Sequence, residues 1–152
     1  VALAERHEAA LVIGQHEYTS APRNEFWFQG QTSQGYLVSL NVSVTDGIGY
    51  RTITVIAPDG STVSHLSNTL LLYELPDGRL VQLSSHPTPG KPNGRVVVWD
   101  AGNDHALVQH REIRLNNQHP VEVRLVNEHI LYVSVASDDT GELPLEYLEI
   151  KI

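Results

Sequence analysis

The segment YLVSLNVSV, at positions 36–44, places an apolar side chain at every even position and a serine or asparagine at positions 39, 41 and 43. Successive side chains of a β-strand point to opposite faces of the sheet, so this period of two predicts a strand with one buried and one solvated face. Such half-burial is typical of antiparallel sheets, because parallel sheets are covered on both faces. The segment therefore indicates an antiparallel sheet.

The same alternation recurs at 121–125, 131–135 and 148–152, and the last of these predicts a closing strand. Pro-Asp-Gly occurs twice between apolar runs, at 58–60 and 76–78. In a turn, proline fixes φ, aspartate accepts backbone hydrogen bonds and glycine tolerates a positive φ. We therefore expect hairpins that pair 50–57 with 61–66, 69–75 with 79–84, and 120–126 with 129–136, and a turn at 46–49 that joins strands 36–44 and 50–57.

Short strands separated by turns every ten residues or so predict an all-β fold. A parallel α/β sheet needs helices between its strands, and the sequence predicts none there. We expect an antiparallel β-sandwich, jelly-roll or immunoglobulin-like, with a small closed β-barrel as the alternative. Residues 21–152 form one domain in this interpretation, and the proline-rich stretch 85–94 is a surface loop. Residues 1–20 form an N-terminal arm, either a short helix or an added strand.

Composition excludes several classes of protein. The 152 residues carry 18 acidic and 10 basic side chains, a net charge of −8, which repels phosphate backbones and argues against nucleic acid as a partner. No apolar run reaches the ~18–20 residues that span a bilayer, so we expect no membrane insertion. The absence of cysteine excludes disulfides, thiolate zinc sites and a cysteine nucleophile. The residue pattern of segments such as 52–60 is similar to that of secreted or particle-surface β-domains, which favours an extracellular or particle-surface location.

Signatures of a reaction are weak in this sequence. His110 and Glu112, with His119 or His129, suggest a two-histidine, one-carboxylate metal site. However, Arg114 shares their face in the predicted strand, which indicates a solvated surface instead. The segment DAGNDH at 100–105 has oxygen ligands but lacks the later carboxylates of a calcium loop. We expect no metal and no cofactor, and the sequence favours a non-enzymatic role with catalysis left open.

The two tryptophans suggest a ligand. Trp27 lies between two phenylalanines in 25–29, where alternation places one aromatic face outward, and Trp99 ends the apolar run 95–99 beside acidic and amide side chains. A flat apolar ring next to polar groups suits a saccharide, which has an apolar ring face and polar hydroxyls. The alternative is that both tryptophans fill the core or an interface. The candidate contacts are Trp27, Trp99, Asp100, Asn103 and Asp104.

Three functions follow from this interpretation. The first is a non-catalytic recognition or assembly module of a larger extracellular or particle-surface protein, with carbohydrate as the ligand to test first. The second is a small lipocalin-like β-barrel that acts as an enzyme or carrier for an apolar molecule. The third is a structural subunit of a virion, fibre or pilus, assembled with other subunits through residues 1–20.

Overall fold

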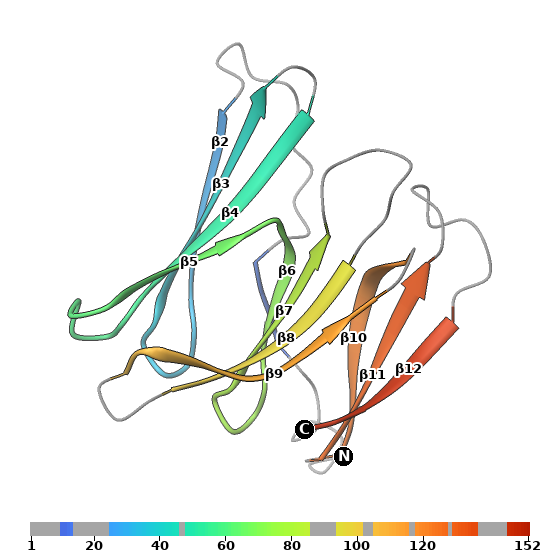
Figure 1. The fold of residues 1–152 in the computed structure, drawn as a ribbon. Coiled ribbons are helices and arrows are strands. Elements are labelled where there is room, and N and C mark those ends of the chain that lie inside the picture. Colours follow the sequence, from blue (N-terminus) through green and yellow to red (C-terminus); the bar gives the residue numbers. More distant parts are fainter. Residues whose placement is uncertain are drawn as a thin grey trace.

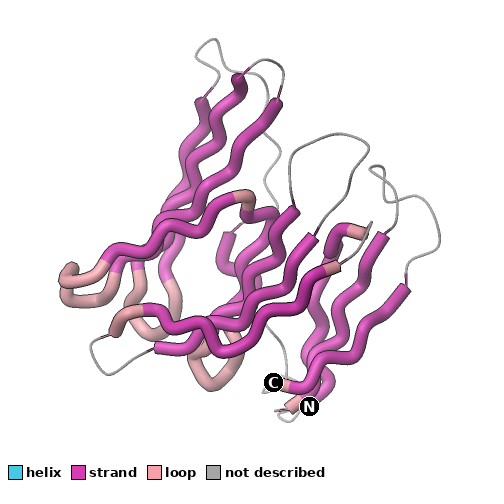
Figure 2. Tube along the Cα trace, in the orientation of Figure 1, coloured by secondary structure: helices cyan, strands magenta, loops and turns pink. Residues whose placement is uncertain are grey.

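The computed structural model describes residues 10–13, 25–45, 48–85, 94–101, 105–115, 118–127, 129–136 and 146–152. Within these ranges all regular structure is β-strand, and no helix occurs (Figure 2). Every neighbouring pair of strands is antiparallel. The all-β, antiparallel prediction is therefore confirmed.

The described strands form three sheets. A four-stranded sheet has the order β2-β3-β4-β5, a five-stranded sheet the order β1-β6-β7-β8-β9, and a three-stranded sheet the order β10-β11-β12. Each of these sheets has two edges, so the described strands do not close into the barrel that was the alternative. The strands are β1 (Ala10–Ile13), β2 (Glu25–Gln31), β3 (Leu37–Thr45), β4 (Ile48–Ile56), β5 (Val63–Ser67), β6 (Thr69–Glu74), β7 (Leu80–Ser85), β8 (Gly94–Ala101), β9 (Leu107–Arg114), β10 (His119–Asn127), β11 (Ile130–Ala136) and β12 (Glu146–Lys151).

The five-stranded sheet lies between the other two (Figure 1). Adjacent residues of β6 show why. Leu72 packs with Leu40 and Ile53 of the four-stranded sheet, whereas Leu71 packs with Leu131 and Val133 of the three-stranded sheet. Burial on both faces explains the run TLLLY at 69–73, which does not alternate as a half-buried strand does. The result is a sandwich of three layers with two hydrophobic cores.

The predicted hairpins are all present. β4 pairs with β5, β6 with β7, and β10 with β11, while β3 pairs with β4 as expected. Gly60 and Gly78 of the two Pro-Asp-Gly turns have φ values of 74° and 93°, a region that favours glycine. Residues 46 and 47 of the fourth turn, and residues 86–93 of the proline-rich stretch, lie outside the described residues.

Residues 10–13 of the predicted arm form a strand. β1 adds to the edge of the central sheet by pairing with β6 of its own chain, with Ala10 opposite Glu74 and Leu11 opposite Tyr73. The strand alternative thus applies to these four residues. Residues 1–9 and 14–20 of the predicted arm lie outside the described residues.

Candidate functional site

Trp99 of β8 is held by a chain of hydrogen bonds. Its indole Nε1 donates to Gln82 Oε1 at 3.0 Å, and Gln82 Nε2 donates to Thr69 Oγ1 at 2.9 Å. The hydroxyl of Thr69 in turn donates to the carbonyl of Leu66 at 2.8 Å. Trp99 is half-buried and packs against the core between the central and four-stranded sheets. The polar end of this indole therefore has a structural partner on the neighbouring strand.

Of the other sequence-predicted contacts, Asp100 and the backbone of Trp27 lie within the described residues. Asp100 follows Trp99, is exposed, and accepts a hydrogen bond from the backbone N–H of Ala101 at 2.9 Å. Asn103 and Asp104 lie outside the described residues. Trp27 lies on β2 opposite Asn41, in a different sheet from Trp99, and its side chain is outside the described part. Asp100 is thus the chain neighbour of Trp99, whereas Trp27 lies on another sheet.

Glu112, the carboxylate of the predicted metal site, instead interacts with two arginine side chains. Arg114 Nε donates to Glu112 Oε1 at 3.1 Å, and Arg95 Nη1 lies 3.6 Å from the same oxygen. The hydrogen bond from Arg114, with the charges of both guanidinium groups, holds the pKa of Glu112 below its usual value. Among the described residues, no group of three or more histidine, aspartate or glutamate side chains is placed to hold a metal ion.

A different surface carries two exposed aromatic rings. Tyr132 of β11 is 36% exposed and Tyr147 of β12 is 67% exposed, both among the largest apolar groups that the described residues present to solvent. They line an open depression of about 420 Å³ together with Arg124 of β10 and Glu149 of β12. We call this surface, defined by Arg124, Tyr132, Tyr147 and Glu149, the tyrosine face.

The alternation of β11 fixes the direction of Tyr132. Leu131, Val133 and Val135 are fully buried against the central sheet, so the residues between them must lie on the opposite face. The same holds on β12, where Ile150 is buried and Tyr147 and Glu149 are exposed. A well-packed core beneath the sheet therefore holds the backbone of the tyrosine face in place.

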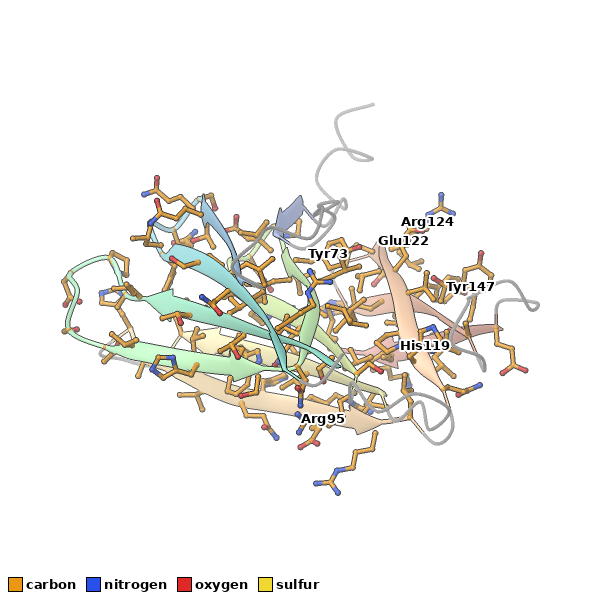
Figure 3. The ribbon with its side chains drawn as sticks, turned by 90° about the horizontal axis from the view of Figure 1, so that it is seen from above. Tyr73, Arg95, His119, Glu122, Arg124 and Tyr147 are labelled. Carbon is orange, nitrogen blue, oxygen red and sulfur yellow. The ribbon has the colours of Figure 1, made fainter. Side chains whose placement is uncertain are left out.

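Strand register sets the spacing of the tyrosine face. Tyr132 lies between Arg124 on one neighbouring strand and Glu149 on the other, and Tyr147 lies opposite Ser134. The two tyrosines are therefore diagonal neighbours, with Cα atoms about 7–8 Å apart in a regular sheet. In Figure 3, Arg124 and Tyr147 lie at the end of the molecule formed by β10–β12, and the guanidinium group of Arg124 points away from the core.

Comparison with protein-family models, with curated proteins and with solved structures gives no match to this chain. Within the described ranges, the structure also contains no helix of the length and apolar character that crossing a membrane requires. The function must therefore be argued from the surfaces themselves.

Sequence reasoning passed over the tyrosine face although a signal was present. Residues 131–135 and 148–152 show which positions face outward, and Tyr132 stands at one of them. An aromatic ring at an outward position is unusual, since such positions are commonly polar on a solvated sheet. The sequence could not predict that Tyr147 lies near Tyr132, because this depends on the register between β11 and β12.

Proposed function

We propose that this protein is a non-catalytic recognition module that binds carbohydrate on the tyrosine face. The observation that carries the proposal is the pair of exposed tyrosines on adjacent strands, with a guanidinium and a carboxylate at the same depression. The ligand class is the one expected from the sequence, but the contacts differ from those predicted there.

The aromatic rings supply the apolar part of such a site. Each tyrosine has a flat apolar body and a hydroxyl at its tip, so it can stack on a sugar ring while the hydroxyl bonds to water or ligand. Tyrosine also has few rotatable bonds, which lowers the entropy lost when a ligand orders it. The diagonal spacing of Tyr132 and Tyr147 lets one ligand touch both rings.

The charged residues supply hydrogen bonds of both kinds. Arg124 has only donors and an ionised Glu149 has only acceptors. Sugar hydroxyls donate and accept, so a ring placed over Tyr132 meets a donor on one neighbouring strand and an acceptor on the other. The depression, about 420 Å³, is within the range of roughly 300–1,000 Å³ seen for small-molecule sites.

The openness of the tyrosine face favours binding over chemistry. Catalytic sites gain from exclusion of water, which strengthens the electrostatic interactions that stabilise a transition state. Here the exposed fraction of Tyr147 is 67%, and the depression is open to solvent. A surface of this kind suits reversible docking onto a sugar chain.

A glycan array followed by calorimetry tests the proposal. We expect the protein to bind a defined set of glycans, and Tyr147→Ala or Tyr132→Ala to weaken the best of them about tenfold, as for an aromatic anchor. Tyr147→Phe keeps the ring and should retain most of the affinity. Val108→Ala, at an exposed position of β9, is the matched control and should change nothing.

Two results would overturn the proposal. One is an array on which the folded protein binds no glycan. The other is a bound glycan whose affinity is unaffected when both tyrosines are replaced by alanine while the circular dichroism of the protein is unchanged. The second result would return attention to Trp99 and Asp100, which can be tested with the same glycan.

A further inference from the structure

A second cavity lies at one end of the interface between the central sheet and the three-stranded sheet. It has a volume of about 410 Å³ and is lined by the turn between β6 and β7, by β10, by the turn between β10 and β11, and by the residue after β12. The lining residues are Leu75, Pro76, Asp77, Arg79, Leu125, His129 and Ile152. None of these residues belongs to the tyrosine face.

The inner wall of this end cavity is aliphatic. Leu75 and Leu125 belong to the hydrophobic core between the two sheets, and Ile152 packs against that core. The cavity is therefore a continuation of the core toward solvent, and apolar atoms placed in it would be removed from water. Its volume is large enough for a small molecule and within the range of roughly 300–1,000 Å³ for ligand pockets.

The rim of the end cavity is rich in hydrogen-bond donors. Arg79 Nε and Nη2 each lie 2.6 Å from Asp77 Oδ2, and the side chain of Arg79 is only 15% exposed. Guanidinium has five N–H donors, and within the described part of the chain Asp77 engages only two of its three nitrogens. His129 also lines the cavity, and a ring N–H of its imidazole is a further hydrogen-bond donor.

The described residues of both turns at the rim are held by hydrogen bonds. In the first turn the N–H of Leu75 donates to the carbonyl of Arg79 at 2.8 Å, and the N–H of Arg79 donates to Asp77 Oδ1 at 3.1 Å. In the second, the N–H of His129 donates to Asn127 Oδ1 at 2.8 Å, and the N–H of Ile152 donates to the carbonyl of His129 at 2.8 Å. A cavity that is formed in advance loses less free energy on binding.

We propose that the end cavity binds a medium-chain carboxylate. The aliphatic chain would contact Leu75, Leu125 and Ile152, and the carboxylate would accept hydrogen bonds from Arg79 and His129. A carboxylate fits better than a neutral head group, because guanidinium is planar and permanently charged and can donate hydrogen bonds to both carboxylate oxygens at once. Asp77 is the competitor for that guanidinium, so its charge should weaken binding.

Sodium octanoate is the probe, and the methyl resonances of Leu75, Leu125 and Ile152 are the readout, with the exposed Leu37 of β3 as a reference. We expect saturable shifts of the three cavity methyls and none of Leu37. 1-Octanol, which lacks the charge, should bind about tenfold more weakly, because a hydrogen bond to a charged group is a strong one. Acetate, which lacks the chain, should bind more than about a hundredfold more weakly, because the burial of the methylene groups is lost.

Two substitutions in the rim give opposite predictions. Arg79→Gln should weaken octanoate binding about tenfold. Asp77→Asn should strengthen it by about threefold, because it removes the competing charge while an oxygen remains to accept the hydrogen bond from the Arg79 N–H. Arg111→Gln, at an exposed position of β9 outside both the end cavity and the tyrosine face, is the control and should leave the octanoate affinity unchanged.

Octanol that binds as tightly as octanoate would overturn the proposal, as would octanoate that leaves the cavity methyls unshifted. Weaker binding by Asp77→Asn would also overturn it, since the ion pair would then only shape the turn. If Arg79→Gln fails to fold, the Asp77→Asn variant and the comparison of octanol with octanoate still test whether the cavity binds a carboxylate. The result does not depend on whether the tyrosine face binds a glycan.

Discussion

The indole of Trp99 and the amide of Gln82 form a 3.0 Å hydrogen bond between strands β8 and β7. Gln82 is only 3% exposed, and its amide nitrogen donates to Thr69, so both ends of the amide are satisfied within the layer between two sheets. The tryptophan that the sequence offered as a ligand platform is thus also part of the internal packing of the central sheet.

Replacing Gln82 should therefore destabilise the fold. Gln82→Leu keeps the approximate size of the side chain but leaves the half-buried Trp99 N–H without its acceptor, for an expected loss of about 1–3 kcal/mol in the free energy of unfolding. Urea unfolding followed by tryptophan fluorescence measures it. Gln109→Leu, on the exposed surface of β9, should cost no more than about 0.5 kcal/mol. Equal losses in the two variants would contradict the interpretation.

Ser33 should matter more than an ordinary turn residue. Its N–H and hydroxyl both donate to the buried carboxylate of Glu74, at 2.9 Å and 2.6 Å, and so tie the turn between β2 and β3 to the central sheet. Ser33→Ala should lower the free energy of unfolding by roughly 1.5–3 kcal/mol, as for a hydrogen bond to a charged group. Thermal unfolding with calorimetry is the measurement.

An exposed serine–carboxylate pair provides the control for Ser33. Ser61 donates from both its N–H and its hydroxyl to Asp59, and these hydrogen bonds lower the pKa of Asp59. Because that pair is solvated, Ser61→Ala should lower stability much less than Ser33→Ala does. A loss at Ser61 as large as that at Ser33 would show that burial of Glu74 is not what makes the contact strong.

Tyr73 predicts a loss of stability in alkaline solution. Burial raises the pKa of the Tyr73 hydroxyl above the usual value of 10.0, and the negative charge of Glu122 raises it further. A hydrogen bond from the Val123 N–H to the Tyr73 oxygen lowers this pKa in part. The folded state therefore holds this proton more tightly than the unfolded state does. The contribution of Tyr73 to the free energy of unfolding is fully present below about pH 10, and it is lost as the pH rises through the folded-state pKa of Tyr73.

The Tyr73→Phe variant isolates that contribution. It should unfold more readily at neutral pH, by about 1 kcal/mol for the lost hydrogen bond, and its stability should fall less steeply above about pH 10. Urea unfolding at a series of pH values gives both quantities. Parallel pH curves for the wild type and the variant would mean that the alkaline loss has another origin.

Gly94 marks a close approach between β8 and the start of β10. A methyl group added there would overlap Pro120 Cδ and lie 2.9 Å from His119 Cα, both in a segment held by the 2.7 Å hydrogen bond from the Gly94 N–H to the Gln118 carbonyl. Gly94→Ala should therefore destabilise by about 1–3 kcal/mol or more, as overpacking does.

Gly60→Ala is the comparison for Gly94, and chemical unfolding of both variants is the measurement. No atom of the described residues lies within 4 Å of a methyl group at Gly60, where φ is +74°, so we expect strain in the backbone conformation, at about 1–2 kcal/mol. If Gly94→Ala proves as stable as the wild type, β8 and β10 are less closely packed than described.

Local patterns predicted the hairpins well, because a Pro-Asp-Gly turn and its flanking strands lie within one short segment. The three-layer arrangement was not predicted. It depends on which sheet covers each face of β6, and the run at 69–73 shows only that both faces are apolar. The tyrosine face was missed for a similar reason, since Tyr132 and Tyr147 become neighbours only through strand register.

The central sheet also determines how the protein should unfold. Leu71 and Leu72, one peptide bond apart, each help to close a different hydrophobic core. Neither outer layer would retain a partner for its apolar side if β6 and β7 separated, so both cores should be lost in one cooperative transition. Amide hydrogens in β7 should accordingly exchange only through global unfolding and be the slowest in the molecule.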